Sequence, residues 1–138
     1  VQLLIRLLHG DEPFEAYEKA VNLCQKQLTG TEYETEFSSY ERVLNLSLPH
    51  AARNAIGSTG YVVSSLEASL WSFLQSDDYE EAVLTAVNLG EDTDTIGFIT
   101  GTVAGVYYGL DGIPEEWIFQ LAKKEELEKA CKKFADIC

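Results

Sequence analysis

The sequence predicts an all-α fold, and three observations support that prediction. Apolar residues recur at three- and four-residue steps through most of the chain, as they do on one face of a helix. No segment alternates convincingly between apolar and polar residues, which is the pattern of a half-buried strand. Most glycines and prolines stand between the periodic segments, where they end helices.

Composition sets the limits of the fold and of its partners. The 138 residues suit a single domain, and 46% of them are apolar, which is enough for a core. The 10 Lys and Arg residues against 23 Asp and Glu residues give a formal charge of −13. This acidity predicts no binding to nucleic acid or to an anionic membrane surface, because phosphates would be repelled. No apolar run reaches the roughly 18 residues of a membrane span.

The cysteines favour a reducing compartment. There are three of them, widely spaced and without a Cys-x-x-Cys pair. A disulfide scaffold and a thiolate zinc site are therefore poor interpretations, and we expect a cytoplasmic protein.

The first half of the chain predicts three helices and then a loop. Residues 1–8 have the apolar density of a buried helix, although nothing precedes them that could cap it. Residues 11–28 are amphipathic, with Pro13 in the first turn, where its missing N–H does no harm. Residues 32–46 predict a third helix. Residues 47–60 contain a proline and two glycines and predict a loop with one short turn.

The second half predicts five more helices. Asp77 is expected as the N-cap of the second of them, with Glu80 completing a capping box. Gly90 ends that helix, and Gly109 ends the next. The expected helices cover residues 61–75, 78–89, 92–108, 114–122 and 124–137.

The candidate metal ligands are Asp92, Asp94 and Thr95, which lie together where one helix ends and the next begins. Helix capping and the helix dipole explain carboxylates here without any ligand, each being worth about 0.3–1 kcal/mol. Three oxygen donors in front of an apolar helix also suit a hard divalent cation such as Mg²⁺, Mn²⁺ or Ca²⁺. The residues alone leave capping and metal binding equally open.

Two other oxygen-ligand motifs do not fit this segment. An EF-hand loop starting at Asp92 would have Gly97 correctly at its sixth position, but Val103 stands where a bidentate glutamate is needed. A D-x-D-x-T/V phosphotransferase signature would follow a buried strand and would have a threonine or valine at the position of Ile96. The segment before it predicts a helix instead.

A row of glycines follows the aspartates at four-residue steps, namely Gly97, Gly101, Gly105 and Gly109. A glycine inside a helix costs about 1 kcal/mol relative to alanine, so something must offset the row. Close approach of another helix is the plausible compensation. We expect a central helix, packed all round, that fixes the aspartates at its N-terminal end.

A second glycine-containing turn, Gly57 to Tyr61, opens another helix. Backbone N–H groups at a helix start bind anions, and glycine lets a phosphate approach. The turn lacks the lysine of a phosphate-binding loop and the strand of a dinucleotide fold, so from the residues alone an ordinary glycine-rich turn is the favoured interpretation. Tyr61 suits either a core position or a stacking platform.

These segments together resemble the C-terminal part of the ADP-ribosylglycohydrolases, a family that includes the dinitrogenase-reductase-activating enzymes. The resemblance rests on the following stretches: Gly90 to Thr95, the glycine row, Tyr107 to Pro114, Trp117, and the Gly60-Tyr-Val-Val segment. It implies a compact all-α multi-helix bundle. Residues 1–138 would form a single all-α unit that is the C-terminal part of the larger domain.

The resemblance also implies a chemistry. Two divalent cations, Mg²⁺ or Mn²⁺, would be bound in part by Asp92, Asp94 and Thr95, with Asp94 bridging both ions. Gly60 and Tyr61 would lie along the ADP-ribose, with the tyrosine beside the adenine. The enzyme would hydrolyse the bond at the distal ribose and release ADP-ribose from an ADP-ribosylated protein or a small conjugate.

The sequence departs from the family in two ways. Glu91 stands where the family often has glycine, and the Thr-Asp-Asp type motif that supplies the family's other metal ligands is absent. We therefore expect a complementary N-terminal chain or segment, and no activity without it. Two alternatives remain: a non-catalytic ADP-ribose-binding or structural protein on the same scaffold, and a different metal hydrolase acting on phosphoesters.

Overall fold

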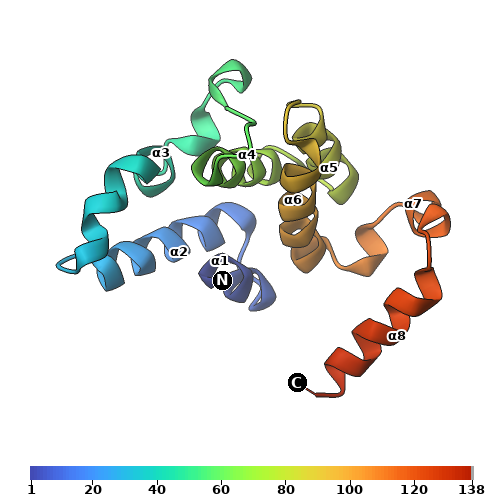
Figure 1. The fold of residues 1–138 in the computed structure, drawn as a ribbon. Coiled ribbons are helices and arrows are strands. Elements are labelled where there is room, and N and C mark those ends of the chain that lie inside the picture. Colours follow the sequence, from blue (N-terminus) through green and yellow to red (C-terminus); the bar gives the residue numbers. More distant parts are fainter. Residues whose placement is uncertain (138) are drawn as a thin grey trace.

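The computed structural model describes residues 1–137 and confirms the all-α prediction, since the elements within those residues are helices and no strand is present. The α-helices are α1 (Gln2–Leu8), α2 (Pro13–Leu28), α3 (Glu41–Leu44), α4 (Val62–Leu74), α5 (Tyr79–Val87), α6 (Thr93–Tyr108), α7 (Glu115–Gln120) and α8 (Lys124–Ala135). Short 3₁₀ segments join them: η1 (Glu32–Tyr40), η2 (Leu48–His50), η3 (Arg53–Ala55) and η4 (Leu110–Gly112). Figure 1 shows their arrangement.

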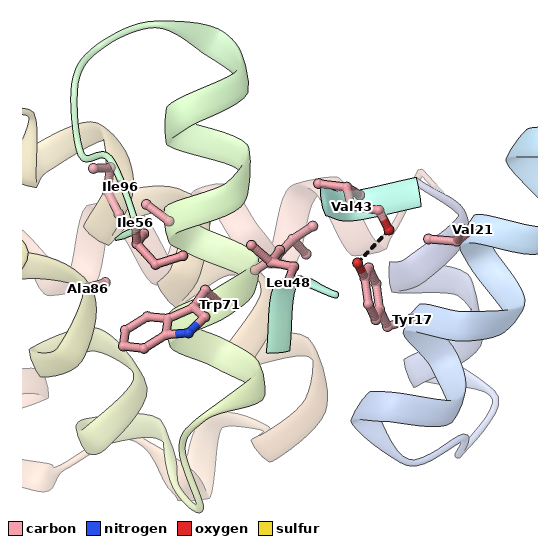
Figure 2. Close-up of a cluster of buried hydrophobic side chains, with 10 residues drawn as sticks. Tyr17, Val21, Val43, Leu48, Ile56, Trp71, Ala86 and Ile96 are labelled. Carbon is pink, nitrogen blue, oxygen red and sulfur yellow. Dashed lines mark hydrogen bonds between the residues drawn. The ribbon is translucent and has the colours of Figure 1, made fainter. Parts of the chain in front are cut away.

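Helix α4 forms the centre of the core, with nine of its thirteen residues buried. On one side it contributes Trp71 to a cluster with Tyr17, Leu48 and Ile96, shown in Figure 2. On the other side Phe73 is fully buried in a second cluster. The two buried sides of this single helix therefore join the N-terminal helices to α6.

Helix α6 lies against α5 through the glycine row, so the predicted close approach is confirmed. A Cβ atom on Gly97 would lie 2.9 Å from Val87 Cγ1, and one on Gly101 would lie 3.2 Å from the hydroxyl oxygen of Tyr79. The expectation that α6 is packed all round is wrong. Thr95 and Thr102 are exposed on one strip of the helix, and Phe98 between them is 75% exposed, because α1, α4 and α5 cover only the other sides.

Two local predictions are also corrected. Residues 32–46 form the 3₁₀ segment η1 and one turn of α-helix instead of a single helix, because η1 has no buried residue and thus no apolar stripe to pack. The N-cap of α5 is Asp78, one residue later than expected: the Glu81 N–H donates to Asp78 Oδ1 at 2.7 Å. The Asp77 N–H donates in turn to Glu81 Oε2 at 2.8 Å.

The end of the described chain extends away from this core. Helix α8 has no buried residue, and Figure 1 shows it projecting beyond α7. The first helix is also more exposed than its apolar density suggested, with only Leu7 buried. Within the described residues, none of the helices has both the length and the apolar character needed to cross a bilayer. Cys24 and Cys131 are free thiols, and Cys138 lies outside the described residues.

Candidate active site

The turn before α4 and the turn before α6 lie side by side, although they are about thirty residues apart in sequence. The Asp92 N–H donates to the carbonyl of Ser58 at 3.0 Å. The Ser58 hydroxyl, which is buried, donates to the carbonyl of Leu89 at 3.3 Å. Arg53 adds a hydrogen bond from its guanidinium to the Asn88 carbonyl. These contacts fix the residues that precede α4 against those that precede α6.

Gly60 in the first turn lies close to the carboxylate of Asp92 in the second. A Cβ atom on Gly60 would lie 2.8 Å from Asp92 Oδ2, closer than real Cβ contacts occur. A side chain at position 60 would therefore displace the Asp92 carboxylate, and this close approach, not an unusual backbone angle, favours glycine there, since Gly60 has no positive φ. The structure thus joins two features that the sequence presented separately.

The carboxylates of Asp92 and Asp94 lie within hydrogen-bonding reach of each other. The side-chain hydrogen bond with Asp92 lowers the pKa of Asp94 below its ordinary value, and the N–H groups of Thr95 and of Asp94 itself lower that pKa further. Asp92 occupies the N-cap position of α6, yet its side chain makes no capping hydrogen bond. Capping therefore does not account for the Asp92 carboxylate.

The neighbouring side chains face solvent. Tyr61 is 61% exposed, which rules out a core role within the described chain and leaves its ring face accessible. Thr95 is exposed, and so is Glu91, which has a positive φ of 55°. The Glu91 backbone thus adopts the left-handed conformation that glycine favours, which is a physical reason for glycine at this position.

The donor set is only part of what a divalent cation requires. Mg²⁺ takes six oxygen ligands in an octahedron and usually keeps several waters. The two carboxylates and the Thr95 hydroxyl are chemically suitable, but within residues 1–137 no three His, Cys, Asp or Glu side chains form a group that could hold a metal. Further ligands would have to come from water, from substrate or from other polypeptide.

An open groove of about 420 Å³ borders this site. Its walls include Arg53 and Ser58 from one turn and Leu89 and Glu91 from the other. A larger groove of about 600 Å³ lies along α5 and does not reach the aspartates. Sequence reasoning missed Arg53 and gave Ser58 no role beyond its place in the Gly57 to Tyr61 turn, because both act through long-range contacts to backbone carbonyls.

An all-α fold that places an acid–Thr–acid–Thr motif at the start of a glycine-lined helix, against a second glycine turn, has the architecture expected of the ADP-ribosylglycohydrolases. The chain belongs to this family, because the ADP-ribosylglycohydrolase family model matches residues 1–138.

Relatives with curated names agree with this assignment. The chain is 38% identical over 85 residues to the ADP-ribosylarginine hydrolase Tri1 of Pseudomonas putida (strain GB-1), a match that covers 62% of this chain and 23% of the relative. It is 35% identical over 71 residues to the ADP-ribosyl-[dinitrogen reductase] glycohydrolase of Rhodospirillum rubrum, covering 51% and 24%. It is 45% identical over 38 residues to the human ADP-ribosylhydrolase ARH3, covering 28% and 10%. The chain thus spans less than a quarter of the length of each of these relatives.

Proposed function

We propose that this chain forms part of a metal-dependent hydrolase that releases ADP-ribose from ADP-ribosylated protein side chains or related conjugates. The observation that carries the proposal is the contact between Gly60 and Asp92, which places the glycine turn and the carboxylate pair in one site. The names of its relatives, which include ADP-ribosylarginine hydrolases and a dinitrogen reductase glycohydrolase, support this substrate class.

In this proposal Asp92, Asp94 and Thr95 are the residues of this chain that would hold two divalent cations, Mg²⁺ or Mn²⁺. Two carboxylates close enough to share a hydrogen bond repel each other once both are ionised, and a cation between them removes that repulsion. The remaining ligands come from water and from a complementary N-terminal chain or segment. When bound, the cations would supply Lewis acidity that stabilises the charge developing on the sugar.

The chain's own residues bind and orient the ADP-ribose. Gly60 leaves the backbone open beside Asp92, and the exposed ring of Tyr61 offers a stacking surface for the adenine. In the reaction a water oxygen bonds to the anomeric carbon of the distal ribose and the bond from that carbon to the acceptor breaks. The acceptor leaves with the proton that the water gives up. Cations and backbone N–H groups hold the pyrophosphate in an otherwise acidic chain.

The metal assignment is tested by titrating Mn²⁺ into the chain and two variants. Asp94→Asn removes a carboxylate charge and is expected to weaken Mn²⁺ binding at least about tenfold, whereas Glu91→Gln removes an exposed charge and is expected to change it less than about threefold. Electron paramagnetic resonance of free Mn²⁺ measures both affinities. Equal losses in the two variants, or no loss in either, would overturn the assignment.

A second candidate is a non-catalytic ADP-ribose-binding or structural protein on the same scaffold. The incomplete donor set within residues 1–137 favours it. Incubating the chain with an ADP-ribosylated peptide, with and without a polypeptide carrying the family's N-terminal metal motif, separates the two. Release of ADP-ribose only in the combined sample supports the hydrolase. Binding of ADP-ribose without release in either sample supports the second candidate, and hydrolysis of a simple phosphoester alone indicates a different metal hydrolase.

A further inference from the structure

An ion pair between the partly exposed Arg42 and the buried Glu67 lies beside the segment that precedes α4. Glu67, on α4, is 6% exposed. Its two carboxylate oxygens accept hydrogen bonds from Nε and Nη2 of Arg42, the first at 3.2 Å. Such a carboxylate is costly to bury unless it is paired, so Glu67 fixes the plane and position of the Arg42 guanidinium.

The guanidinium has a third contact, and this one leads toward the site. Arg42 Nη1 donates to the carbonyl oxygen of Ala55 at 2.6 Å. Ala55 ends the 3₁₀ turn η3, and Ile56, the next residue, is buried in the core cluster. The start of the segment 53–60 is therefore attached to α3 and α4 at a defined point.

The other end of the same segment holds Asp92. The carbonyl of Ser58 accepts the Asp92 N–H, and Gly60 lies so close to the Asp92 carboxylate that an added Cβ would be 2.8 Å from Oδ2. Only two residues separate Ala55 from Ser58, so a displacement of the Ala55 carbonyl moves the surface on which Asp92 rests. Helix α3 is itself fixed, because the Tyr17 hydroxyl donates to the Val43 carbonyl at 2.6 Å.

We propose that Arg42 is a positioning residue for Asp92: held by Glu67, its guanidinium fixes the Ala55 carbonyl and thereby sets segment 53–60 against the Asp92 backbone and carboxylate. The consequence for metal binding rests on the proposed function, whereas the consequence for the Asp92 backbone does not. Arginine is required because a single ammonium group cannot reach both Glu67 oxygens and the Ala55 carbonyl in one plane.

Three variants of the full chain separate positioning from stability. Arg42→Lys keeps a charge beside Glu67 but loses the planar fork that also reaches Ala55. The double variant Arg42→Met with Glu67→Met removes the ion pair without leaving a buried charge unpaired, an exchange that proteins often tolerate. Glu67→Gln is an intermediate variant, because its amide oxygen accepts one Arg42 hydrogen bond while its NH2 group faces the second guanidinium donor, so that the guanidinium is held by one bond instead of two.

The first readout is amide hydrogen exchange of the Asp92 N–H, measured by NMR. The N–H of Phe73, a fully buried residue near the C-terminal end of α4, is the reference for global unfolding. We expect Asp92 exchange to rise about tenfold more than that reference in Arg42→Lys and in the double variant, and by a smaller factor in Glu67→Gln, which keeps one of the two bonds to Arg42. An Asp92 rate that follows the Phe73 rate in all three variants would refute the positioning role.

The second readout is Mn²⁺ affinity, expected to fall about tenfold in the same two variants. If Asp94→Asn abolishes Mn²⁺ binding but the Arg42 variants leave both Mn²⁺ affinity and Asp92 exchange unchanged, the positioning role fails and the proposed function stands. If the unmodified chain binds no Mn²⁺ through Asp94, the proposed function fails. Asp92 exchange then decides the role of Arg42 by itself.

Discussion

Replacing Gly60 with alanine tests the contact on which the proposed site depends. The added Cβ would lie 2.8 Å from Asp92 Oδ2, whereas ordinary van der Waals contact begins at 3.4 Å. The carboxylate must therefore retreat by about 0.6 Å, the difference between those two distances. Metal–oxygen distances in protein sites are held to about ±0.2 Å, so a shift of this size takes Asp92 out of ligand position.

We expect Gly60→Ala to lower Mn²⁺ affinity about tenfold, near the lower end of what is lost when a neighbour that orients a metal ligand is removed. The fold should survive, because Gly60 is exposed and its backbone accepts alanine. Gly57→Ala is the matched control from the same turn, since its Cβ would meet nothing closer than Ser64 Oγ at 3.6 Å. Thermal unfolding of both variants checks that they are folded at the titration temperature.

The result that would refute this reasoning is specific. If Gly60→Ala and Gly57→Ala bind Mn²⁺ equally well, and as well as the unmodified chain, then the Asp92 carboxylate does not contribute to a metal site. Equal weakening in both variants would show that the turn as a whole matters and not the contact with Asp92.

Two further predictions concern stability. In α6, Gly97→Ala places a Cβ 2.9 Å from Val87 Cγ1 and should destabilise the chain by about 1 kcal/mol, net of the gain in helix propensity. Gly105→Ala places a Cβ 3.8 Å from Tyr79 and should stabilise the chain by up to about 1 kcal/mol. Urea denaturation measures both changes, and the same sign for both would contradict the packing described. Burial, with a contribution from the Glu67 charge, raises the pKa of Tyr17 to about 12. Because the folded-state pKa is raised, protonated Tyr17 contributes fully to stability below pH 10.0, the pKa of the unfolded chain. This contribution to the free energy of unfolding, roughly 2–3 kcal/mol, is lost as the pH rises through 12. Tyr17→Phe should lower stability at pH 7 by about 1 kcal/mol, because it removes the hydrogen bond to the Val43 carbonyl. Between pH 10 and 12 the variant should lose stability less steeply with pH than the unmodified chain. Urea denaturation at several pH values measures this, and the same pH dependence in both proteins would contradict the account.

The helices and their order follow from local chemistry, which is why sequence reasoning predicted them well. Gly109, which has a positive φ of 72°, ends α6 where a glycine was expected to end it, and Pro13 stands at the start of α2. The prediction failed where tertiary packing decides. Residues 32–40 have the spacing of a helix but nothing to pack against, so they form a 3₁₀ segment. The N-cap of α5 moved by one residue because two adjacent aspartates offer the same chemistry.

The candidate site was likewise predicted where a local motif encodes it and missed where contacts between distant residues decide. The sequence indicated the carboxylate pair from its motif, and it indicated Gly60 from a resemblance that gave no reason for the glycine. The structure supplies that reason in the Asp92 carboxylate, a contact across about thirty residues that no local pattern encodes. The same holds for Arg42, an ordinary charged residue in the sequence whose three hydrogen-bonding nitrogens meet Glu67 and Ala55 only after folding.

The arrangement of α6 explains why these long-range contacts converge on its first turn. Its glycine face lies so close to α5 that the helix has little freedom to shift along that contact, since a methyl group on Gly97 would lie only 2.9 Å from Val87 Cγ1. The remaining freedom is in the turn that enters the helix, where Glu91 adopts a left-handed backbone and Asp92 makes no cap bond of its own. That turn depends on Ser58 and Gly60 for its position. A rigid helix with an externally positioned first turn keeps Asp92 and Asp94 in fixed relation to the segment that would carry the ligand, which is what a shared metal and substrate site requires.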